Sequence, residues 1–393
     1  MSPPRTRVGV FGYFGMGNIG NEGTLAAFLS ALRSRHPGAD VHAFVAGPAE
    51  VEQEHGVPAT RLMAYRPAGT LPRAADLVVK ALSRVWDVPR TFRAMGSLDV
   101  LVVPGTGVLE TALLTQPWSL PYWMFLAVAC SRLRGRRVAL VAVGAEPARD
   151  RVTRTLHAWT VRLAHHVSYR DTASRAAMAE SGAPRGDALV YPDLAFGLPA
   201  PAPRPRRRDL VVLGVMRYDV EDDPDGAVER YASTMTDLVC ALVGSGRAVR
   251  TIVGDLADLP LAREIVARSQ SRAGRSCPVE ACDAATMGAL LDEAAGAGVV
   301  VASRFHHVVA GVLAGTPVVS LGYAEKNARL LAEVGLAGAS QRIDDIDLGR
   351  LLTEIDRAAS SGPAVSDATA EALERFRKEL DDLYEVLSTV VGD

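Results

Sequence analysis

The chain alternates short apolar runs with longer segments whose apolar residues recur every three or four positions. The first pattern is typical of buried strands and the second of amphipathic helices. In the first half it predicts strands at Val8–Phe11, Val41–Val45, Asp99–Val103, Val138–Val143 and His166–Tyr169, and helices at Leu25–Arg35, Tyr122–Arg132, Val152–Ala164 and Asp171–Glu180. This alternation favours a parallel sheet with helices on both faces.

Alternating prolines interrupt the pattern at Leu198–Asp209 and predict a stiff, exposed connector between domains. The alternation then restarts, with strands at Leu210–Val215, Val249–Gly254, Gly298–Ala302 and Pro317–Leu321 and helices at Tyr231–Gly244, Leu259–Ser269, Met287–Ala295, Phe305–Ala314 and Asn327–Val334. A long charged amphipathic helix follows at Ala368–Thr389. We therefore predict α/β domains at residues 1–200 and 209–365, and a C-terminal helix at 366–393.

Composition narrows the classes of partner. The chain has 393 residues, 48% hydrophobic and 22% charged, with a formal net charge of -2. This balance provides no broad positive field for nucleic acid, so we expect no nucleic-acid partner. The four cysteines have the spacing of neither a redox pair nor a zinc site. Because the first residues lack the apolar segment of a signal peptide, we expect a cytoplasmic protein.

The segment Trp118–Arg137 joins an aromatic, apolar helix to a basic end. Such a segment can touch the inner face of a membrane. The alternative is a buried core helix that ends in surface arginines, and we favour it. The sequence leaves the oligomeric state open.

The loop at Gly12–Leu25 contains a G-x-G-x-x-G pattern at Gly15–Gly20, directly after a predicted strand. A dinucleotide site also needs an acid at the end of the second strand. That strand ends in Ala46-Gly47-Pro48, and its acid, Asp40, lies at the other end. We therefore expect no NAD binding.

The same loop offers a helix N-terminus, where backbone N–H groups can bind an anion. Its polar residues exceed what a tight turn needs, which favours a ligand over a simple βα turn. These residues are Asn18, Asn21 and Glu22.

A second polar segment, Ser303–His307, lies between a predicted strand and a predicted helix. Ligands of open α/β sheets bind at this carboxyl end of the strands. Arg304 can hold a carboxylate or phosphate, and His306 can exchange protons near neutral pH. The alternative is that His306 and His307 only satisfy hydrogen bonds at the helix start. Two histidines without a nearby acid make a poor metal site, so no metal is expected.

Together these motifs resemble those of the polysaccharide pyruvyl transferase family. The resemblance covers most of the chain in order. Its motifs are the glycine loop GYFGMGNIGNEGTL, the second glycine loop DVLVVPGTGVLE, the Arg170-Asp171 pair with Ser174, the segment VYPDLAF with Asp193, and the SRFHH segment with the downstream Lys326. Asn21 and Thr106 replace residues that are more common in the family.

The resemblance implies two Rossmann-like domains facing a cleft, as in GT-B glycosyltransferases. It implies transfer of pyruvate from phosphoenolpyruvate to a sugar diol, forming a cyclic ketal and releasing phosphate. The acceptor can be lipid- or nucleotide-linked. No cofactor is expected beyond phosphoenolpyruvate as co-substrate, with the first domain on the acceptor side and the second on the phosphoenolpyruvate side.

Residue roles follow from the same resemblance and from this chemistry. We expect Arg304 to clamp an anion and His306 to act as acid and base. Further anion or substrate ligands would be Arg170, Arg217, His307 and Lys326, whereas Asn18, Asn21, Glu22, Gly105 and Thr106 would line the acceptor side. For Arg170 the alternative is an ion pair with a neighbouring acid.

Two other functions stay open. One is a GT-B glycosyltransferase or nucleotide-sugar epimerase, whose donor phosphates would occupy a similar helix N-terminus. The other is a non-catalytic sugar- or anion-binding protein that keeps the fold.

Overall fold

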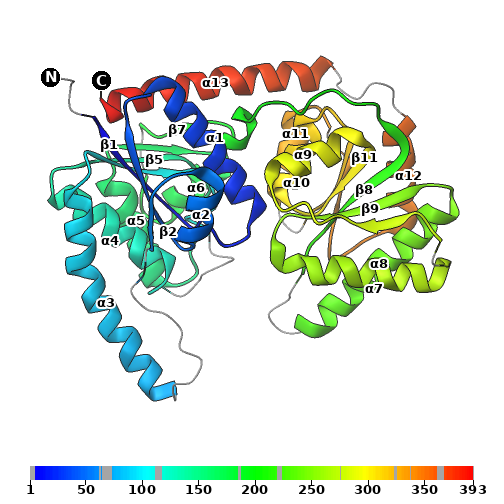
Figure 1. Ribbon diagram of the computed structural model, residues 1–393, viewed down its shortest axis with the longest axis horizontal. Helices are drawn as coiled ribbons and strands as arrows, with labels where there is room; N and C mark the ends of the chain where they lie inside the picture. Colours follow the sequence, from blue (N-terminus) through cyan, green and yellow to red (C-terminus); the bar gives the residue numbers. More distant parts are fainter. Residues whose placement is uncertain are drawn as a thin grey trace. The chain divides into compact units, whose positions relative to one another are not determined.

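The computed structural model describes residues 5–61, 63, 73–110, 117–184, 187–218, 224–274, 276–322, 325–336, 338–360 and 367–392. The chain forms two compact units. The first unit comprises Met1–Met16, Thr24–Gly197 and Arg377–Asp393, and the second comprises Gly17–Gly23 and Leu198–Phe376. Figure 1 shows a helix-covered sheet in each unit.

The first unit contains a parallel sheet of 7 strands in the order β3-β2-β1-β4-β5-β6-β7. The strands are β1 (Arg7–Gly12), β2 (Asp40–Val45), β3 (Ala59–Arg61), β4 (Val100–Pro104), β5 (Arg137–Val143), β6 (His166–Tyr169) and β7 (Leu189–Val190). In the centre, Val8 of β1 is in register with Val41 of β2 and with Val100 of β4. These strands read as continuous apolar runs because both faces of the sheet are covered.

The helices of this unit are α2 (Pro48–His55), α3 (Arg73–Gly96), α4 (Leu120–Leu133), α5 (Arg151–Leu163) and α6 (Thr172–Glu180), together with α1 (Ile19–Arg35) from Thr24 onward and α13 (Asp367–Val391) from Arg377 onward. Helix α4 is a core helix, since Trp123, Met124 and Val128 are buried against the sheet. Within the segment Trp118–Arg137, α4 therefore has the buried form favoured from sequence, whereas Trp118 before it is 58% exposed.

The second unit contains a parallel sheet of 6 strands in the order β10-β9-β8-β11-β12-β13. Its strands are β8 (Arg207–Val215), β9 (Ala248–Val253), β10 (Val279–Ala281), β11 (Ala297–Ala302), β12 (Val318–Gly322) and β13 (Ser340–Arg342). Its helices are α7 (Pro224–Gly244), α8 (Leu259–Ala273), α9 (Met287–Gly296), α10 (Phe305–Leu313), α11 (Glu325–Glu333) and α12 (Leu348–Ser360). None of the helices in the described ranges is long and apolar enough to cross a bilayer.

Each sheet has one point at which the strand order reverses. In the first unit it lies between β1 and β4, and in the second between β8 and β11. Loops that leave neighbouring strands in opposite directions open a crevice at such a point, and ligands of open α/β sheets bind there. The glycine loops follow β1 and β4, and Ser303–His307 follows β11.

The units differ from the predicted domains in two places. The short segment Gly17–Gly23 belongs to the second unit although it lies near the start of the chain. Helix α13 is not a separate part, because its residues up to Phe376 belong to the second unit and those from Arg377 to the first. The change of unit at Leu198 coincides with the start of the proline-rich connector.

Candidate functional site

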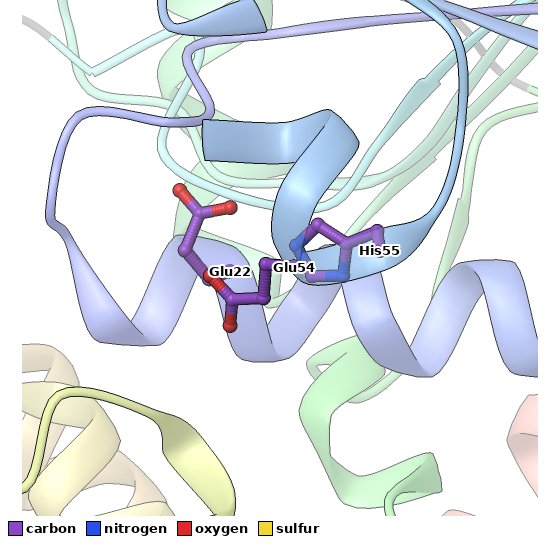
Figure 2. A group of neighbouring side chains, drawn as sticks. All are labelled: Glu22, Glu54 and His55. Atoms are coloured by element: carbon purple, nitrogen blue, oxygen red, sulfur yellow. The ribbon is translucent and has the colours of Figure 1, made fainter. Parts of the chain in front are cut away.

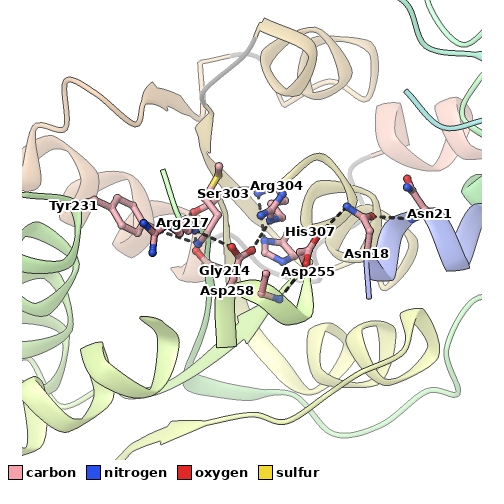
Figure 3. A network of polar contacts seen from close by, with 12 residues as sticks. Asn18, Asn21, Gly214, Arg217, Tyr231, Asp255, Asp258, Ser303, Arg304 and His307 are labelled. Atoms are coloured by element: carbon pink, nitrogen blue, oxygen red, sulfur yellow. Dashed lines mark hydrogen bonds and ion pairs between the residues drawn. The ribbon is translucent and has the colours of Figure 1, made fainter. Parts of the chain in front are cut away.

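The carboxyl edge of the second sheet gathers polar residues from several loops. Arg217 follows β8, Asp255 and Asp258 follow β9, and Arg304 follows β11. Figure 3 shows these side chains close together around the ends of the strands. Since the strands are parallel, their carboxyl ends share one edge of the sheet, and β8 and β11 flank its reversal point.

Asp258 holds two of these loops in place. Its carboxylate is 1% exposed; it accepts a bond from Arg304 Nε at 2.6 Å and one from the Arg217 backbone N–H at 2.9 Å. The guanidinium of Arg304 keeps 21% of its side-chain surface exposed. A buried carboxylate therefore orients a half-buried cation at the reversal point.

His307 lies beneath Arg304 and is fully buried. Its Nδ1 accepts a hydrogen bond from the Arg304 backbone N–H at 3.3 Å, which fixes the first turn of α10. Burial, and then the charge of Arg304, lower the pKa of His307 to about 3. The imidazole is thus neutral at physiological pH and supports Arg304 structurally.

Two glycines near the ends of strands β8 and β9 leave room for the side chains of Arg304 and His307. A Cβ atom on Gly214, in β8, would lie 2.2 Å from His307 Nδ1, and one on Gly254, after β9, would lie 2.6 Å from Arg304 Cδ. Any other residue would displace these side chains, because real Cβ atoms do not approach so closely. The two glycines form part of the site although they carry no chemistry.

A buried polar layer connects β8, β11 and α7 below this edge. Ser303 Oγ donates to the Gly214 carbonyl at 2.6 Å and lies 3.5 Å from the Tyr231 hydroxyl. Burial raises the pKa of Tyr231 to about 12, so the hydroxyl keeps its proton. These contacts tie Arg304 to the sheet through its neighbour in the chain.

His306 is half-buried, in contrast to His307. Its ring meets the ring of Phe305 edge-on, with centroids 5.4 Å apart. The ring also packs against the backbone of Gly20, where a Cβ would lie 2.0 Å from His306 Nδ1. His306 is therefore the more accessible of the two histidines.

The first glycine loop reaches this site through Gly17–Gly23. Ile19 N–H donates to the Gly254 carbonyl at 3.0 Å, and Leu256 N–H donates to the Gly17 carbonyl at 2.9 Å. Asn18 Nδ2 adds a bond to Asp255 Oδ2 at 3.3 Å. The segment thus pairs with the loop after β9, beside Arg304 (Figure 3).

Asn18, Asn21 and Glu22, which were predicted to line the acceptor side, belong to the same unit as Arg304 and His306. Their contact with an acceptor stays a prediction. Asn18 also caps α1, since its Oδ1 accepts a hydrogen bond from Asn21 N–H at 3.0 Å. Glu22, in the first turn of α1, is 6% exposed.

Lys326 is the remaining predicted ligand of this unit. It is half-buried near the start of α11, the helix that follows β12. Because β12 pairs with β11 in parallel, Lys326 lies on the same edge of the sheet as Arg304. The exposed Arg217 side chain lies on this edge as well.

In the first unit, Gly105 and Thr106 form the turn after β4, at the reversal point of that sheet. Gly105 has a φ of 51° and Thr106 a φ of 58°. A β-branched residue rarely adopts this left-handed conformation, so the backbone is strained here. Within the described residues, the buried Thr106 hydroxyl has no hydrogen-bond partner. Strain and an unsatisfied buried hydroxyl both mark Thr106 as a candidate ligand contact.

Arg170 has a different environment. It follows β6 in the interior of the first unit, with 5% of its side chain exposed. It forms an ion pair with Glu110, and its Nη1 lies 3.5 Å from Asp193 Oδ2. Asp171 caps α6 by accepting from Ser174 N–H at 2.6 Å. The ion-pair alternative for Arg170 is therefore the one that the contacts support.

Figure 2 draws three potential metal ligands: Glu22 on α1, and Glu54 and His55 at the end of α2. Glu22 belongs to the second unit, whereas Glu54 and His55 belong to the first. The three therefore do not form a site within either unit.

The sequence pattern pointed to Arg304 and His306 but missed the residues that position them. Asp255 and Asp258 could have been found, since both follow a predicted strand at its carboxyl end. The roles of Gly20, Gly214 and Gly254 depend on contacts between distant segments, which a single sequence does not reveal.

A helix N-terminus, an oriented arginine and an accessible histidine thus share one edge of the second sheet. The first two attract an anion such as a phosphate or carboxylate, and the third can transfer a proton to a molecule held there. The model for polysaccharide pyruvyl transferases matches residues 18–325, which include every one of these groups. The chain belongs to this family.

Comparison with solved structures shows the GT-B fold. A putative UDP-N-acetylglucosamine 2-epimerase from Listeria monocytogenes is similar with a TM-score of 0.57 and 12% identity, over 97% of each chain. The UDP-GlcNAc 2-epimerase from Neisseria meningitidis bound to UDP-GlcNAc has a TM-score of 0.59 and 11% identity, over 96% of this chain and 99% of that chain. The glycosyltransferase SnogD from Streptomyces nogalater has a TM-score of 0.54 and 16% identity, over 98% of this chain and 100% of that chain.

No curated protein sequence matches the chain. The family assignment therefore rests on the family model, and the solved structures contribute the fold alone.

Proposed function

We propose that this transferase uses phosphoenolpyruvate to form a cyclic pyruvate ketal on a sugar diol, releasing phosphate. The observation that carries the proposal is the pair of Arg304 and His306 at the reversal point of the second sheet, in a chain of the pyruvyl transferase family. Phosphoenolpyruvate carries a carboxylate and a phosphate on one small frame, so its site needs oriented cations and a proton donor.

In this mechanism Arg304, held by Asp258, binds one of the anionic groups of phosphoenolpyruvate. Arg217 and Lys326, on the same edge, are further candidate ligands for its second anionic group. The α10 N-terminus adds a positive dipole end at this position. Because Asp258 already holds the Arg304 side chain in place, Arg304 loses less conformational entropy when phosphoenolpyruvate binds.

His306 donates a proton to the methylene carbon, and C2 gains positive character. One sugar hydroxyl attacks C2 and loses its proton, the C2–O bond to phosphate breaks, and a second hydroxyl closes the ring. The two sugar hydroxyls release two protons. One replaces the proton that was added to the methylene carbon, and the other leaves with phosphate. Neutral His306 can accept a hydroxyl proton, which restores the donor for the next turnover.

The acceptor belongs to the same proposal. The structural neighbour bound to UDP-GlcNAc suggests a nucleotide-linked sugar as a first candidate. A lipid-linked sugar is the other class. Thr106, with its strained backbone and buried hydroxyl, is the residue of the first unit that we propose contacts the acceptor.

The test measures phosphate release from phosphoenolpyruvate with a panel of sugar diols, nucleotide-linked and lipid-linked. His306→Gln keeps a polar side chain of similar length but cannot act as acid near neutral pH, so we expect kcat to fall by about 10²-fold or more. Arg304→Lys should mainly raise the KM for phosphoenolpyruvate, since Lys lacks the planar fork. Thermal melting would verify that both variants fold.

Normal turnover by His306→Gln would refute its role as acid. A second candidate function, a GT-B glycosyltransferase or nucleotide-sugar epimerase, is favoured by the fold of the structural neighbours. Thermal stabilisation by UDP-sugars without any phosphoenolpyruvate-dependent phosphate release would support that function instead.

A further inference from the structure

Helix α3 carries an apolar face that is exposed in the structure. Val78 is 58% exposed, Leu82 65%, Val85 71% and Trp86 68%. Their spacing of three and four residues places them on one side of the helix. In Figure 1, α3 (blue-cyan) extends away from the sheet of its unit. Contiguous apolar surface of this kind on a folded protein marks an interaction site.

The face extends beyond α3 itself. Trp118, which precedes α4, is 58% exposed, and the backbone carbonyl of Trp118 accepts a hydrogen bond from Arg84 Nε at 2.8 Å. An apolar groove of about 920 Å³ lies between α3, Trp118 and Tyr122. We call this surface, formed by Val78, Val79, Leu82, Val85, Trp86 and Trp118, the α3 face.

The other long amphipathic helix shows that such exposure is not general. On α13, Phe376, Leu380, Leu383 and Leu387 are buried, and Val386 and Val390 are half-buried. Acidic residues outnumber basic ones in α13, as is common for a solvated helix face. Helix α3 differs from α13 in both respects.

The charge around the α3 face is positive. Among the described side chains of α3, Lys80, Arg84, Arg90 and Arg93 are basic, whereas Asp76 and Asp87 are acidic. Lys80 pairs with Asp76 at 3.0 Å and Arg84 pairs with Asp87 at 3.6 Å, so the excess positive charge comes from Arg90 and Arg93. One of its acids, Asp87, is buried and accepts a hydrogen bond from Trp123 Nε1 at 3.0 Å, so it is directed into the core. Arg134 stacks on Phe92 at 4.9 Å and adds a further cation beside the helix.

An apolar surface with basic residues beside it favours an anionic bilayer over a second copy of the chain as the partner of the α3 face. A second copy of the chain, packed α3 against α3, would bring two basic surfaces together, because a symmetric contact pairs the same patch with itself. An anionic bilayer accepts both features at once. Tryptophan and aliphatic side chains enter the interfacial layer, while Lys and Arg reach the lipid phosphates.

We propose that the α3 face is a docking surface for an anionic lipid bilayer. The helix lies in the plane of the interface, with Leu82, Val85 and Trp86 inserted and the exposed Arg93 and Arg134 at the level of the headgroups. The proposal is independent of the proposed reaction, since it concerns a surface outside the catalytic edge of the second unit.

The test is co-sedimentation of the full chain with phosphatidylcholine vesicles and with vesicles that also contain phosphatidylglycerol. We expect binding to the anionic vesicles and weaker binding as salt rises. Leu82→Ser with Trp86→Ser should lower the binding constant at least about tenfold. Arg93→Glu, at an exposed position, should lower it about fivefold or more.

The control is Trp159→Ser on α5, which removes a tryptophan that is 48% exposed but lies outside the α3 face. It should bind vesicles as the wild type does. A blue shift of tryptophan emission on binding, lost when Trp86 and Trp118 become phenylalanine, would report insertion of this face directly.

Three results would overturn the proposal. The first is no sedimentation with anionic vesicles. The second is equal binding by wild type and by the Leu82→Ser, Trp86→Ser double variant. The third is a lipid-free dimer in analytical ultracentrifugation that the double variant converts to monomer without any vesicle binding by the wild type, which would assign the face to a second copy.

Discussion

Gly20 and His306 lie nearly three hundred residues apart in the chain, yet the imidazole of His306 occupies the space that a side chain on Gly20 would fill. The glycine pattern of the opening loop suggested a phosphate-binding turn, but this glycine has another role. It leaves room for the residue that we propose as proton donor. The glycine at position 20 is thus explained by its contact with His306, which the local sequence motif does not reveal.

Gly20→Ala should therefore disturb His306. The added Cβ would lie 2.0 Å from Nδ1, so the ring must move, and we expect a loss of stability of roughly 1–3 kcal/mol and reduced phosphate release. Gly288→Ala is the matched control, because Gly288 is also helical but has open space around it. The control should be unchanged or slightly more stable. Equal melting temperatures for the two variants would show that His306 does not depend on Gly20.

The site illustrates what one sequence can predict. Arg304 and His306 were identified because a polar run after an apolar strand is visible in the sequence. Asp258 holds Arg304 across 46 positions of sequence, and only the fold reveals this pairing. The strained φ of Thr106 was also not predictable, because left-handed backbone is expected at glycine.

At the scale of elements, most central strands were predicted because they are continuous apolar runs. The predicted Val249–Gly254 and Gly298–Ala302, for example, correspond to β9 and β11. Short edge strands such as β3 and β13 were not predicted, since three residues carry too little periodicity. Helix α3 was not predicted either. Its regularly spaced apolar residues are exposed, whereas such residues in an amphipathic helix usually face the core.

The pairing of Gly17–Gly23 with the loop after β9 can be tested at one hydrogen bond. Leu256→Pro removes the N–H that donates to the Gly17 carbonyl, and the extended backbone of Asp255 accommodates a following proline. Leu256→Ala keeps the N–H and serves as control. We expect faster hydrogen exchange at the Ile19 amide in the proline variant, corresponding to about 1 kcal/mol. Identical exchange in both variants would contradict this pairing.

At the scale of the whole molecule, each unit contains a buried neutral histidine, His157 in the first and His307 in the second. Burial lowers the pKa of His157 from 6.5 to about 4. The unfolded chain therefore takes up a proton below pH 6.5 that the folded chain refuses until about pH 4. Each such histidine contributes stability that is complete above pH 6.5 and is lost as the pH falls through this window.

His157→Leu should reduce this acid sensitivity. We expect the free energy of unfolding of the wild type to fall by about 3 kcal/mol more than that of the variant between neutral pH and pH 4. Urea titrations across this range would measure the difference. Parallel pH profiles for the two proteins would show that His157 is not the group responsible.

The path of the chain has a consequence for dissection of the protein. The proline-rich connector looks like the natural place to cut, but a fragment beginning at Leu198 would lack Gly17–Gly23, and with it the backbone partner of Gly254 and the neighbour of His306. The other fragment would lose its α13 residues from Arg377 onward. Each piece would thus lack contacts that its unit makes in the intact chain, so we expect half-proteins to recover full stability only when mixed. To exchange the second unit between related proteins, by evolution or by engineering, the segment Gly17–Gly23 would have to be exchanged together with Leu198–Phe376.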